Sequence, residues 1–313
     1  MHLAIIGTGR VGQMLAYTLL PEKYITKLSL SDTKPHLTQA VAEELRHVAA
    51  GNNRTLEIAA FTKNELVTDA DIIMISAGVP RNSQTKDRRD LVKFNAKIIK
   101  SIAISITAQN PRAKYIIVTN PVYAMASIFT HYSKAKFVVG TGTSLDSLRF
   151  RSELAKNLRV PVSEVAGFVG GEHGVHAVFL WSTVKIFGKN LDTYLKTNHL
   201  IIDKEQIITS VKTISKLIID IIGGTAQGPA TAFCEIVRAI ALGQKRLIPV
   251  AVPHQFPKLP QPIYITIPLR LGKKIGPDIE KNLTLLEKAA IQTAAQEIYQ
   301  TYQEALTVTS LES

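Results

Sequence analysis

Residues 3–12, LAIIGTGRVG, decide how the first half of the chain folds. Four apolar residues, Leu3–Ile6, run directly into three closely spaced glycines, which is the pattern of a buried parallel strand, a tight turn and a helix. Gly7 permits a sharp turn, Gly9 lets the main chain approach an anion, and Gly12 lets the helix lie close to the strand. The stretch therefore predicts a diphosphate site at the start of that helix.

An acidic residue follows the glycine turn at the sequence separation that is usual in dinucleotide-binding folds. Asp32 closes the next apolar stretch, Leu28–Ser31, about 20 residues after the turn, where a ribose-binding carboxylate is expected. A carboxylate there accepts hydrogen bonds from the ribose hydroxyls and repels a 2′-phosphate, so it favours NAD over NADP. Lys34, two residues further on, would soften this preference. We therefore predict a coenzyme site formed by the turn, including Arg10 and Val11, and by Asp32.

Composition limits the classes of protein to which the chain can belong. Its 313 residues suffice for two domains, and its single cysteine, Cys234, excludes an internal disulfide. Strand-like sequence begins at His2, which leaves no room for a signal segment, and no apolar run reaches the about 18 residues of a membrane span. We therefore expect a cytoplasmic protein with no membrane contact. The net charge of +12 comes from dispersed Lys and Arg with few aromatic residues between them, so no nucleic-acid partner is expected.

Short apolar stretches alternate with helical patterns through the first half of the chain. The expected strands are His2–Ile6, Lys27–Ser31, Leu56–Ala59, Asp71–Ala77, Tyr115–Thr119 and Phe137–Val139. The expected helices are Gln13–Leu20, Leu37–Ala49, Leu91–Ala108 and Tyr123–His131. This alternation predicts an α/β fold with a doubly wound parallel sheet, the Rossmann arrangement. Ligands bind beyond the carboxyl ends of such strands, so the strand ends near residues 32, 77 and 119 are candidate binding positions.

The remainder of the chain has a different pattern, and we expect a Rossmann domain over residues 1–142 and an α+β substrate domain over residues 143–313. A helix near Ser144–Leu158 leads into a Gly-rich loop at Gly167–Gly174. The other expected elements are helices at Lys204–Ile222, Pro229–Leu242 and Leu283–Leu306, and strands at Arg246–Val252 and Pro262–Leu269.

Two groups of side chains in the second half are candidates for chemistry. His173 lies in the segment GGEHG, where the glycines bend the backbone to present the ring, and a loop imidazole suits proton transfer near neutral pH. Glu172 and His176 raise the alternative of a metal site, but the sequence offers no further ligand cluster, so no metal is expected. Asp146 and Arg149 share a helix face, and their spacing alone predicts a surface ion pair.

Charge is dense between an expected strand end and the following helix. The segment Arg81–Asp90, RNSQTKDRRD, contains no apolar residue that would hold it on a core. It is either a solvated surface loop or a lid that brings guanidinium groups onto a bound anion.

Taken together, the motifs give the chain a clear resemblance to the lactate/malate dehydrogenases. They occur in that family's order and at about its spacing, over about the first 175 residues. The motifs are GTGRVG followed by Asp32, AGVPR at Ala77–Arg81, Arg88, TNP at Thr119–Pro121, LDSLRFR at Leu145–Arg151 and GEHG at Gly171–Gly174.

The resemblance implies an NAD-dependent oxidoreductase that acts on a small 2-hydroxy or 2-oxo acid. It implies that His173 is the acid/base, that Asp146 pairs with His173, and that Arg149 grips the C1 carboxylate of the substrate. Arg88 would polarise the substrate carbonyl, and Asn120 would hydrogen-bond near it. NAD contacts are implied at the glycine turn and at Asp32, Ala77, Gly78, Asn95, Thr119 and Asn120.

The substrate is less clear than the reaction. Arg81 matches the arginine with which malate-type members of the family bind a second carboxylate, which favours malate and oxaloacetate and thus the tricarboxylic acid cycle. The loop after it has one more residue than is usual in the family, so Asn82 is an alternative at the specificity position. Thr225, in GGTAQG, resembles the threonine of lactate-type members. Tyr123 stands where the family usually has an aspartate.

The alternatives are an L-lactate or branched 2-hydroxyacid dehydrogenase and, more remotely, an NAD-dependent glycoside hydrolase that uses a metal and a cysteine, or a secondary nucleic-acid-binding role. The family resemblance suggests a homodimer or homotetramer.

Overall fold

The glycine turn follows a strand in the middle of a parallel sheet. The computed structural model describes residues 1–79 and 88–310, with only the backbone of Arg88–Asp90. In it β1 (His2–Ile6) pairs in parallel with β2 (Lys27–Ser31) and β4 (Ile72–Ile75). The parallel set is completed by β3 (Glu57–Phe61), β5 (Lys114–Ile117) and β6 (Val138–Gly140). The order β3-β2-β1-β4-β5-β6 confirms the predicted doubly wound sheet.

Helices cover both faces of this sheet, which is why its strands are continuously apolar. Leu3 and Ile5 point into a core formed with one set of helices, whereas Ala4 and Ile6 point into a core formed with the other. The first set is α1 (Arg10–Leu19), α2 (Leu37–Gly51) and α8 (Gln227–Leu242). The second set is α3 (Arg88–Thr107), α4 (Val122–Tyr132) and α9 (Leu285–Ser310). In the described part of the chain, no helix has the length and apolar character that crossing a membrane requires.

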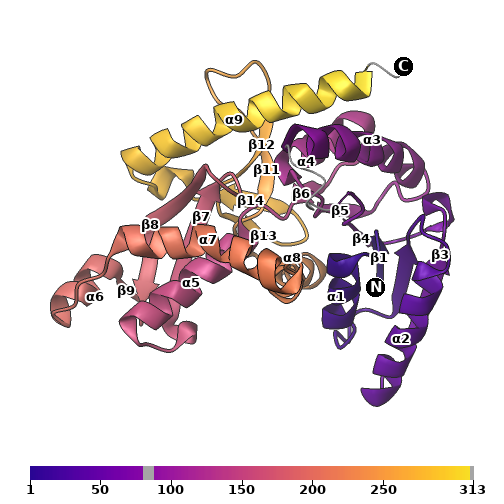
Figure 1. Cartoon of the computed structure of the whole chain (residues 1–313), viewed down its shortest axis with the longest axis horizontal. Helices are drawn as coiled ribbons and strands as arrows, with labels where there is room; N and C mark the ends of the chain where they lie inside the picture. The colour runs from indigo at the N-terminus through magenta and orange to yellow at the C-terminus, as the bar shows by residue number, and fades with distance from the viewer. Residues whose placement is uncertain (80–87, 311–313) are drawn as a thin grey trace.

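The second half of the chain extends the same sheet with antiparallel strands. They follow β6 in the order β11 (Ala251–His254), β12 (Ile263–Thr266), β7 (Val165–Gly171), β8 (Ala177–Ile186) and β9 (Lys189–Asn190). A separate small sheet contains β10 (Arg246–Ile248), β13 (Leu269–Leu271) and β14 (Ile275–Asp278). A third core lies between β7, β8 and the helices α5 (Ser144–Leu158), α6 (Leu191–Thr197) and α7 (Lys204–Ile222). Helix α9 runs along the molecule from β8 to α3 (Figure 1) and contacts both halves.

Two segments were each predicted to form a single strand, and both predictions are wrong because each segment forms parts of two strands. The expected strand Arg246–Val252 divides into β10 and β11, which belong to different sheets. The expected strand Pro262–Leu269 divides into β12 and β13 in the same way. A proline stands at each break, Pro249 and Pro268, and proline has no N–H to donate to a strand ladder.

The expected Gly-rich loop at Gly167–Gly174 is also partly wrong, because its first five residues belong to β7. Glycine has a low strand propensity, yet neighbouring side chains and main chain leave little room for anything larger here. A Cβ at Gly167 would lie 3.3 Å from the ring of Phe150, and one at Gly170 would lie 3.1 Å from the carbonyl of Thr266. Only the last part of the segment, which contains His173, is a loop.

Candidate active site

The glycine turn connects β1 to α1 and has room for a ligand at only one of its glycines. Gly7 has a φ of +92°, and a Cβ there would collide with the backbone of Ala77. A Cβ at Gly12 would collide with the carbonyl of Gly7. Nothing lies within 4 Å of the position a Cβ would take at Gly9, the N-cap residue of α1, and no side chain caps that helix. The turn therefore leaves an uncapped helix N-terminus open to an anion.

Asp32 lies beside this turn, at the end of β2. Its Oδ2 accepts hydrogen bonds from the backbone N–H of Thr8 at 2.8 Å and from the Thr8 hydroxyl at 3.3 Å. Its Oδ1 accepts a hydrogen bond from the backbone N–H of Lys34 at 2.9 Å. The carboxylate is thereby held next to the open turn, as the spacing predicted.

Asn95 joins the ends of β4 and β5 from α3. Its side-chain oxygen accepts the N–H of Val79 at 2.7 Å, and its nitrogen donates to the carbonyl of Asn120 at 2.7 Å. The Thr119 hydroxyl donates to the carbonyl of Ala77 at 2.7 Å. A Cβ at Gly78 would meet both the Thr119 and the Asn95 side chains. Asn95 is buried, and both its amide oxygen and its amide nitrogen are hydrogen-bonded to the main chain. It therefore fixes the positions of the segments that follow the two strands.

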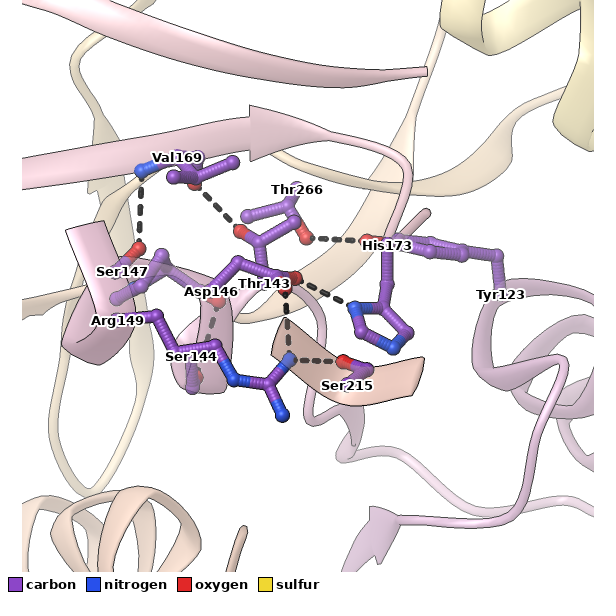
Figure 2. A network of polar contacts seen from close by, with 11 residues as sticks. Tyr123, Thr143, Ser144, Asp146, Ser147, Arg149, Val169, His173, Ser215 and Thr266 are labelled. Atoms are coloured by element: carbon purple, nitrogen blue, oxygen red, sulfur yellow. Dashed lines mark hydrogen bonds and ion pairs between the residues drawn. The ribbon is translucent and has the colours of Figure 1, made fainter. Parts of the chain in front are cut away.

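A single buried carboxylate joins two cationic groups in the second half (Figure 2). Asp146, on α5, accepts a hydrogen bond from Nδ1 of His173 at 2.6 Å. Its other oxygen lies 3.8 Å from Nη1 of Arg149. The exposed fractions of the Asp146 and Arg149 side chains are 8% and 13%, so the prediction of a surface ion pair is wrong. Helix α7 and strand β7 pack against α5, and spacing within α5 carries no information about these contacts.

The local charges keep the imidazole cationic over a wider pH range than usual. The Asp146 carboxylate raises the pKa of His173 above its ordinary value, and this effect outweighs burial and the neighbouring Arg149 cation. Burial lowers the pKa of Arg149, but a guanidinium stays protonated at neutral pH. The site therefore presents a protonated imidazole and a guanidinium side by side.

Hydrogen bonds that the sequence did not reveal fix this cluster. Arg149 donates from Nη1 to the hydroxyl of Ser215 on α7 at 2.6 Å. At the start of α5, Thr143 donates to the carbonyl of Val169, and Ser147 accepts the Val169 N–H. These two bonds tie the helix that carries Asp146 to the strand that leads to His173. Each partner comes from a distant part of the chain, so no local pattern could have identified it.

One pocket connects the coenzyme turn to this cluster. It is lined by Val11, Asn120, His173 and Thr225, with apolar walls that include Leu145 and Phe233. Its volume is about 510 Å³ including the open mouth, within the range of small-molecule sites. Four candidate residues from separate motifs therefore meet at one cavity.

Arg10 connects the turn to the junction of α7 and α8. Its guanidinium donates to the carbonyl of Ile222 at 2.9 Å and to that of Gly224 at 3.4 Å. Thr225 is the next residue, so the side chain of Arg10 links the turn to a wall of the pocket.

The remaining candidates lie apart from this pocket or outside the described residues. Arg81 and Asn82 lie outside the described residues, and only the backbone of Arg88 is described, at the start of α3.

The alternatives that require a metal ion find little support. Cys234 is buried within α8, where burial raises the pKa of its thiol to about 12, which does not suit the cysteine of a metal-dependent hydrolase. His176 pairs with Glu172 at 3.1 Å. Within residues 1–79 and 88–310, no three His, Cys, Asp or Glu side chains are grouped to hold a metal ion.

Comparisons with known proteins agree with the motifs. Residues 1–138 match the lactate/malate dehydrogenase NAD-binding domain, and residues 143–308 match the alpha/beta C-terminal domain of the same family. A malate dehydrogenase of Sulfurisphaera tokodaii is 37% identical over 97% of this chain and 96% of its own length. An L-lactate dehydrogenase of Streptococcus equinus is 32% identical over 79% and 76%. The crystal structure of malate dehydrogenase from Plasmodium falciparum superposes with a TM-score of 0.91 at 26% identity, covering 99% of this chain and 100% of that one.

Proposed function

The chain belongs to the lactate/malate dehydrogenase family and is an NAD-dependent dehydrogenase, and from this premise we propose that it interconverts malate and oxaloacetate. The proposal rests on one observation, the Asp146 carboxylate that joins the His173 imidazole to the Arg149 guanidinium beside the pocket. A 2-oxo acid carries a carbonyl next to a carboxylate, so its reduction needs a proton donor next to a carboxylate-binding cation. The similarity to a malate dehydrogenase supports malate as the hydroxy acid.

The coenzyme would lie along the carboxyl ends of the parallel strands, in a domain of residues 1–142, with residues 143–313 forming the substrate domain. The Gly7–Gly12 turn, with Arg10 and Val11, would hold the diphosphate at the α1 N-terminus. Asp32 would accept the ribose hydroxyls and disfavour a 2′-phosphate, and the strand ends at Ala77, Gly78 and Thr119 would line the remaining path. NADH, when bound, supplies the hydride that reduces the substrate carbonyl.

His173 would move the proton. Negative charge develops on the substrate oxygen during reduction, and a protonated imidazole can neutralise it. Because Asp146 occupies Nδ1, the proton would come from Nε2. Asp146 fixes the orientation of the ring and stabilises its cationic form. In the oxidation of the hydroxy acid, the neutral ring would accept the same proton.

Arg149 would bind the C1 carboxylate, because its planar fork matches two carboxylate oxygens. One of its nitrogens already contacts Asp146 and Ser215, and the other amino group points away from both (Figure 2). Asn120, in the pocket wall, and Arg88, at the start of α3, would act on the substrate carbonyl.

Arg81 would bind the second carboxylate of oxaloacetate, the one that is not held by Arg149. Asn82, the next residue, is the alternative for this role. Thr225 lines the pocket beside His173, and its hydroxyl would narrow the room for the substrate tail. This feature keeps L-lactate and branched 2-hydroxy acids as the second candidate substrates.

A panel of substrates tests the proposal. Purified protein is mixed with NADH and, in separate assays, with oxaloacetate, pyruvate and a branched 2-oxo acid, and the loss of NADH absorbance is followed. The highest kcat/KM is expected with oxaloacetate. A preparation that carries His173→Ala serves as the blank for contaminating host dehydrogenases. A preference for pyruvate would replace the substrate within the same class, whereas no turnover with any of the three would contradict the proposed site.

We propose further that the enzyme works in the cytoplasm, in the tricarboxylic acid cycle, as a homodimer or homotetramer. Exposed apolar side chains near the end of α7 support self-association, since the exposed fractions of Ile219, Ile221 and Ile222 are 42%, 74% and 55%. Light scattering on the purified protein measures the mass directly, and a monomeric mass at assay concentration would exclude the oligomer.

A further inference from the structure

The side chain of Arg10 leaves the coenzyme turn and reaches the end of a helix in the other half of the chain. Arg10 is the first residue of α1, so its main-chain N–H is one of the N-terminal donors that have no partner within the helix. Its guanidinium is engaged elsewhere, because Nη1 donates to the carbonyls of Ile222 at 2.9 Å and Gly224 at 3.4 Å. We call these two hydrogen bonds the Arg10 clamp. The main chain and the side chain of Arg10 therefore contact different parts of the molecule.

A pair of glycines makes room for the guanidinium. Gly223 is the C-cap of α7 with a φ of +75°, and Gly224 has a φ of +136°. A Cβ at Gly223 would lie 3.2 Å from Nη2 of Arg10, and one at Gly224 would lie 3.6 Å from Cδ of Arg10. The arginine side chain thus lies across both glycines, and its close approach depends on the absence of side chains there.

The charge of Arg10 suits this position. The carbonyls at the C-terminal end of a helix carry partial negative charge, so a cation near them is stabilising. Helix α7 has no basic residue in its own last turn. That turn contains an acidic residue instead, Asp220, which pairs with Lys216. Arg10 therefore supplies, from α1, the cation that the last turn of α7 lacks.

Within a single chain, core packing fixes the beginning of α7 but not its end. The buried residues of α7 are Ile207 and Val211, both in its first half. Its middle is held by the hydrogen bond that Ser215 accepts from Arg149. In its last turn, the side chains of Ile221 and Ile222 are exposed. The position of the end of α7 therefore depends on the Arg10 clamp.

The residues next to the clamp on either side both line the pocket. Val11 follows Arg10 on α1, and Thr225 follows Gly224 in the connection from α7 to α8. The clamp therefore joins the two segments that supply these walls of the pocket, and it limits how far Thr225 can lie from Val11. His173 borders the same cavity, so this separation affects the space that is left for a substrate.

We propose that Arg10 is a positioning residue for substrate selection: its guanidinium holds the end of α7 on the coenzyme turn and thereby keeps Thr225 at a distance from Val11 that suits a short, unbranched substrate. The proposal rests on the proposed function, in which this pocket holds a 2-oxo acid. Without the clamp, the last turn of α7 would loosen and Thr225 would lie further from Val11 on average. A branched substrate tail would then fit more easily.

The chain contains a matched control for the clamp. Nη2 of Arg54 also donates to two main-chain carbonyls, those of Glu22 at 3.0 Å and Ile25 at 2.8 Å. These carbonyls lie in the connection from α1 to β2, at the opposite end of α1 from the coenzyme turn. Arg10→Met and Arg54→Met each remove a guanidinium from two carbonyls and keep an unbranched side chain. Only the first removes a contact next to the pocket, and Arg10 is exposed, so its replacement leaves the core intact.

The first test compares substrate selectivity in the two variants and the wild type. The measured quantity is the ratio of kcat/KM for oxaloacetate to kcat/KM for a branched 2-oxo acid. Arg10→Met is expected to lower this ratio about 3- to 10-fold, because pocket shape discriminates between such tails. The NADH dissociation constant should stay within about twofold, because the main-chain donors of the turn remain. Arg54→Met should match the wild type in both quantities.

Three outcomes of this test would overturn the proposal. The first is an unchanged ratio in Arg10→Met, and the second is an equal change of the ratio in both variants. The third is a rise of about 10-fold or more in the NADH dissociation constant of Arg10→Met, which would show that the guanidinium serves the diphosphate of the coenzyme instead.

Amide hydrogen exchange separates this proposal from the proposed function, because it needs no turnover. Peptides that cover residues 219–226 are compared at equal protein concentration and without substrate. Faster exchange is expected in Arg10→Met, since the last turn of α7, which includes the hydrogen bond from the Gly223 N–H to the carbonyl of Ile219 at 2.9 Å, loses its capping cation. Arg54→Met should leave the exchange of these peptides unchanged. Unchanged exchange in Arg10→Met would overturn the proposal even if the protein reduces oxaloacetate. Faster exchange in a protein that reduces no 2-oxo acid would support the clamp and contradict the proposed function alone.

Discussion

The guanidinium of Arg149 donates to the hydroxyl of Ser215 at 2.6 Å, across the space between α5 and α7. Asp146, which lies on the same helix as Arg149, contacts the same nitrogen from 3.8 Å. The direction of the guanidinium is thus set by one group on its own helix and one on a helix more than sixty residues later in the chain.

Replacing Ser215 by alanine tests this relationship. The arginine would keep its charge but lose one orienting partner, so substrate carboxylate binding weakens equally in the ground and transition states. We expect the KM for oxaloacetate to rise about 3- to 10-fold, equivalent to about one hydrogen bond, with kcat nearly unchanged. Thr213→Ala is the matched control, since the Thr213 hydroxyl bonds only along α7, to the carbonyl of Thr209. A larger effect on kcat than on KM would contradict the orienting role.

Replacing His173 by alanine should abolish most of the turnover without affecting coenzyme binding. General acid catalysis contributes about 10²- to 10⁴-fold, and the decrease in kcat should lie in that range. The NADH dissociation constant, measured by fluorescence titration, should stay close to that of the wild type, because the glycine turn, and not the imidazole, would hold the diphosphate. Arg149→Ala should show the same separation between turnover and NADH binding. Near-normal turnover in either variant would mean that the reaction takes place elsewhere.

Replacing Asp146 by asparagine should shift the pH dependence in a defined direction. The carboxylate is the main reason that the pKa of His173 is raised, and burial, which lowers it, remains in the variant. Reduction needs the protonated ring, so its rate falls as the pH rises through that pKa. The fall should therefore begin at lower pH in Asp146→Asn than in the wild type. Full pH profiles of kcat for oxo-acid reduction measure the shift, and a shift to higher pH would exclude this assignment.

The same pair predicts how stability varies with pH. A histidine whose folded pKa is raised contributes stability that is fully present below its unfolded value, about 6.5, and is lost as the pH rises through the folded value. The wild type should lose this contribution over that window, and Asp146→Asn should not. Denaturant unfolding at several pH values provides the comparison.

Replacing Arg81 by glutamine should move the substrate preference from oxaloacetate toward pyruvate. An arginine paired with a carboxylate in a closed site is worth well over the 1.4 kcal/mol that corresponds to a factor of ten. The ratio of kcat/KM values for the two acids should therefore change by about 10-fold or more. Asn82→Ala tests the alternative, in which Asn82 recognises the second carboxylate of oxaloacetate. An unchanged ratio in Arg81→Gln, with a changed ratio in Asn82→Ala, would transfer the role to Asn82.

Replacing Asp32 by serine should relax the choice of coenzyme. The change removes the charge that repels a 2′-phosphate, and Lys34 is close by to attract one. We expect the preference for NADH over NADPH, measured as a ratio of kcat/KM values, to fall by about 10-fold. Ser31→Ala is the neighbouring control, since the Ser31 hydroxyl bonds to Asn64 and leaves the carboxylate in place. A preserved ratio in Asp32→Ser would show that another group selects the coenzyme.

The sequence predicted the elements in which local pattern and final environment agree. The strand ending at Gly7 and the helix after it are examples, because an apolar run and a glycine turn suit a buried sheet. It failed at β7, where glycines with low strand propensity are required by Phe150 and Thr266, which pack against them. It also missed the burial of Asp146 and the contact of Ser215 with Arg149. Those depend on contacts with segments far away in the chain, which spacing cannot encode.

The pairing of β11 with β6, through Ala251 and Gly140, has a consequence for how the protein can be divided. A fragment that ends at residue 142 would leave β6 as an uncovered edge strand, which invites association with other chains. It would also lose α8 and α9, which cover opposite faces of the parallel strands. The parallel strands of the first half therefore rely on the second half for cover on one edge and on both faces, and we expect a fragment of residues 1–142 to expose apolar surface and to associate.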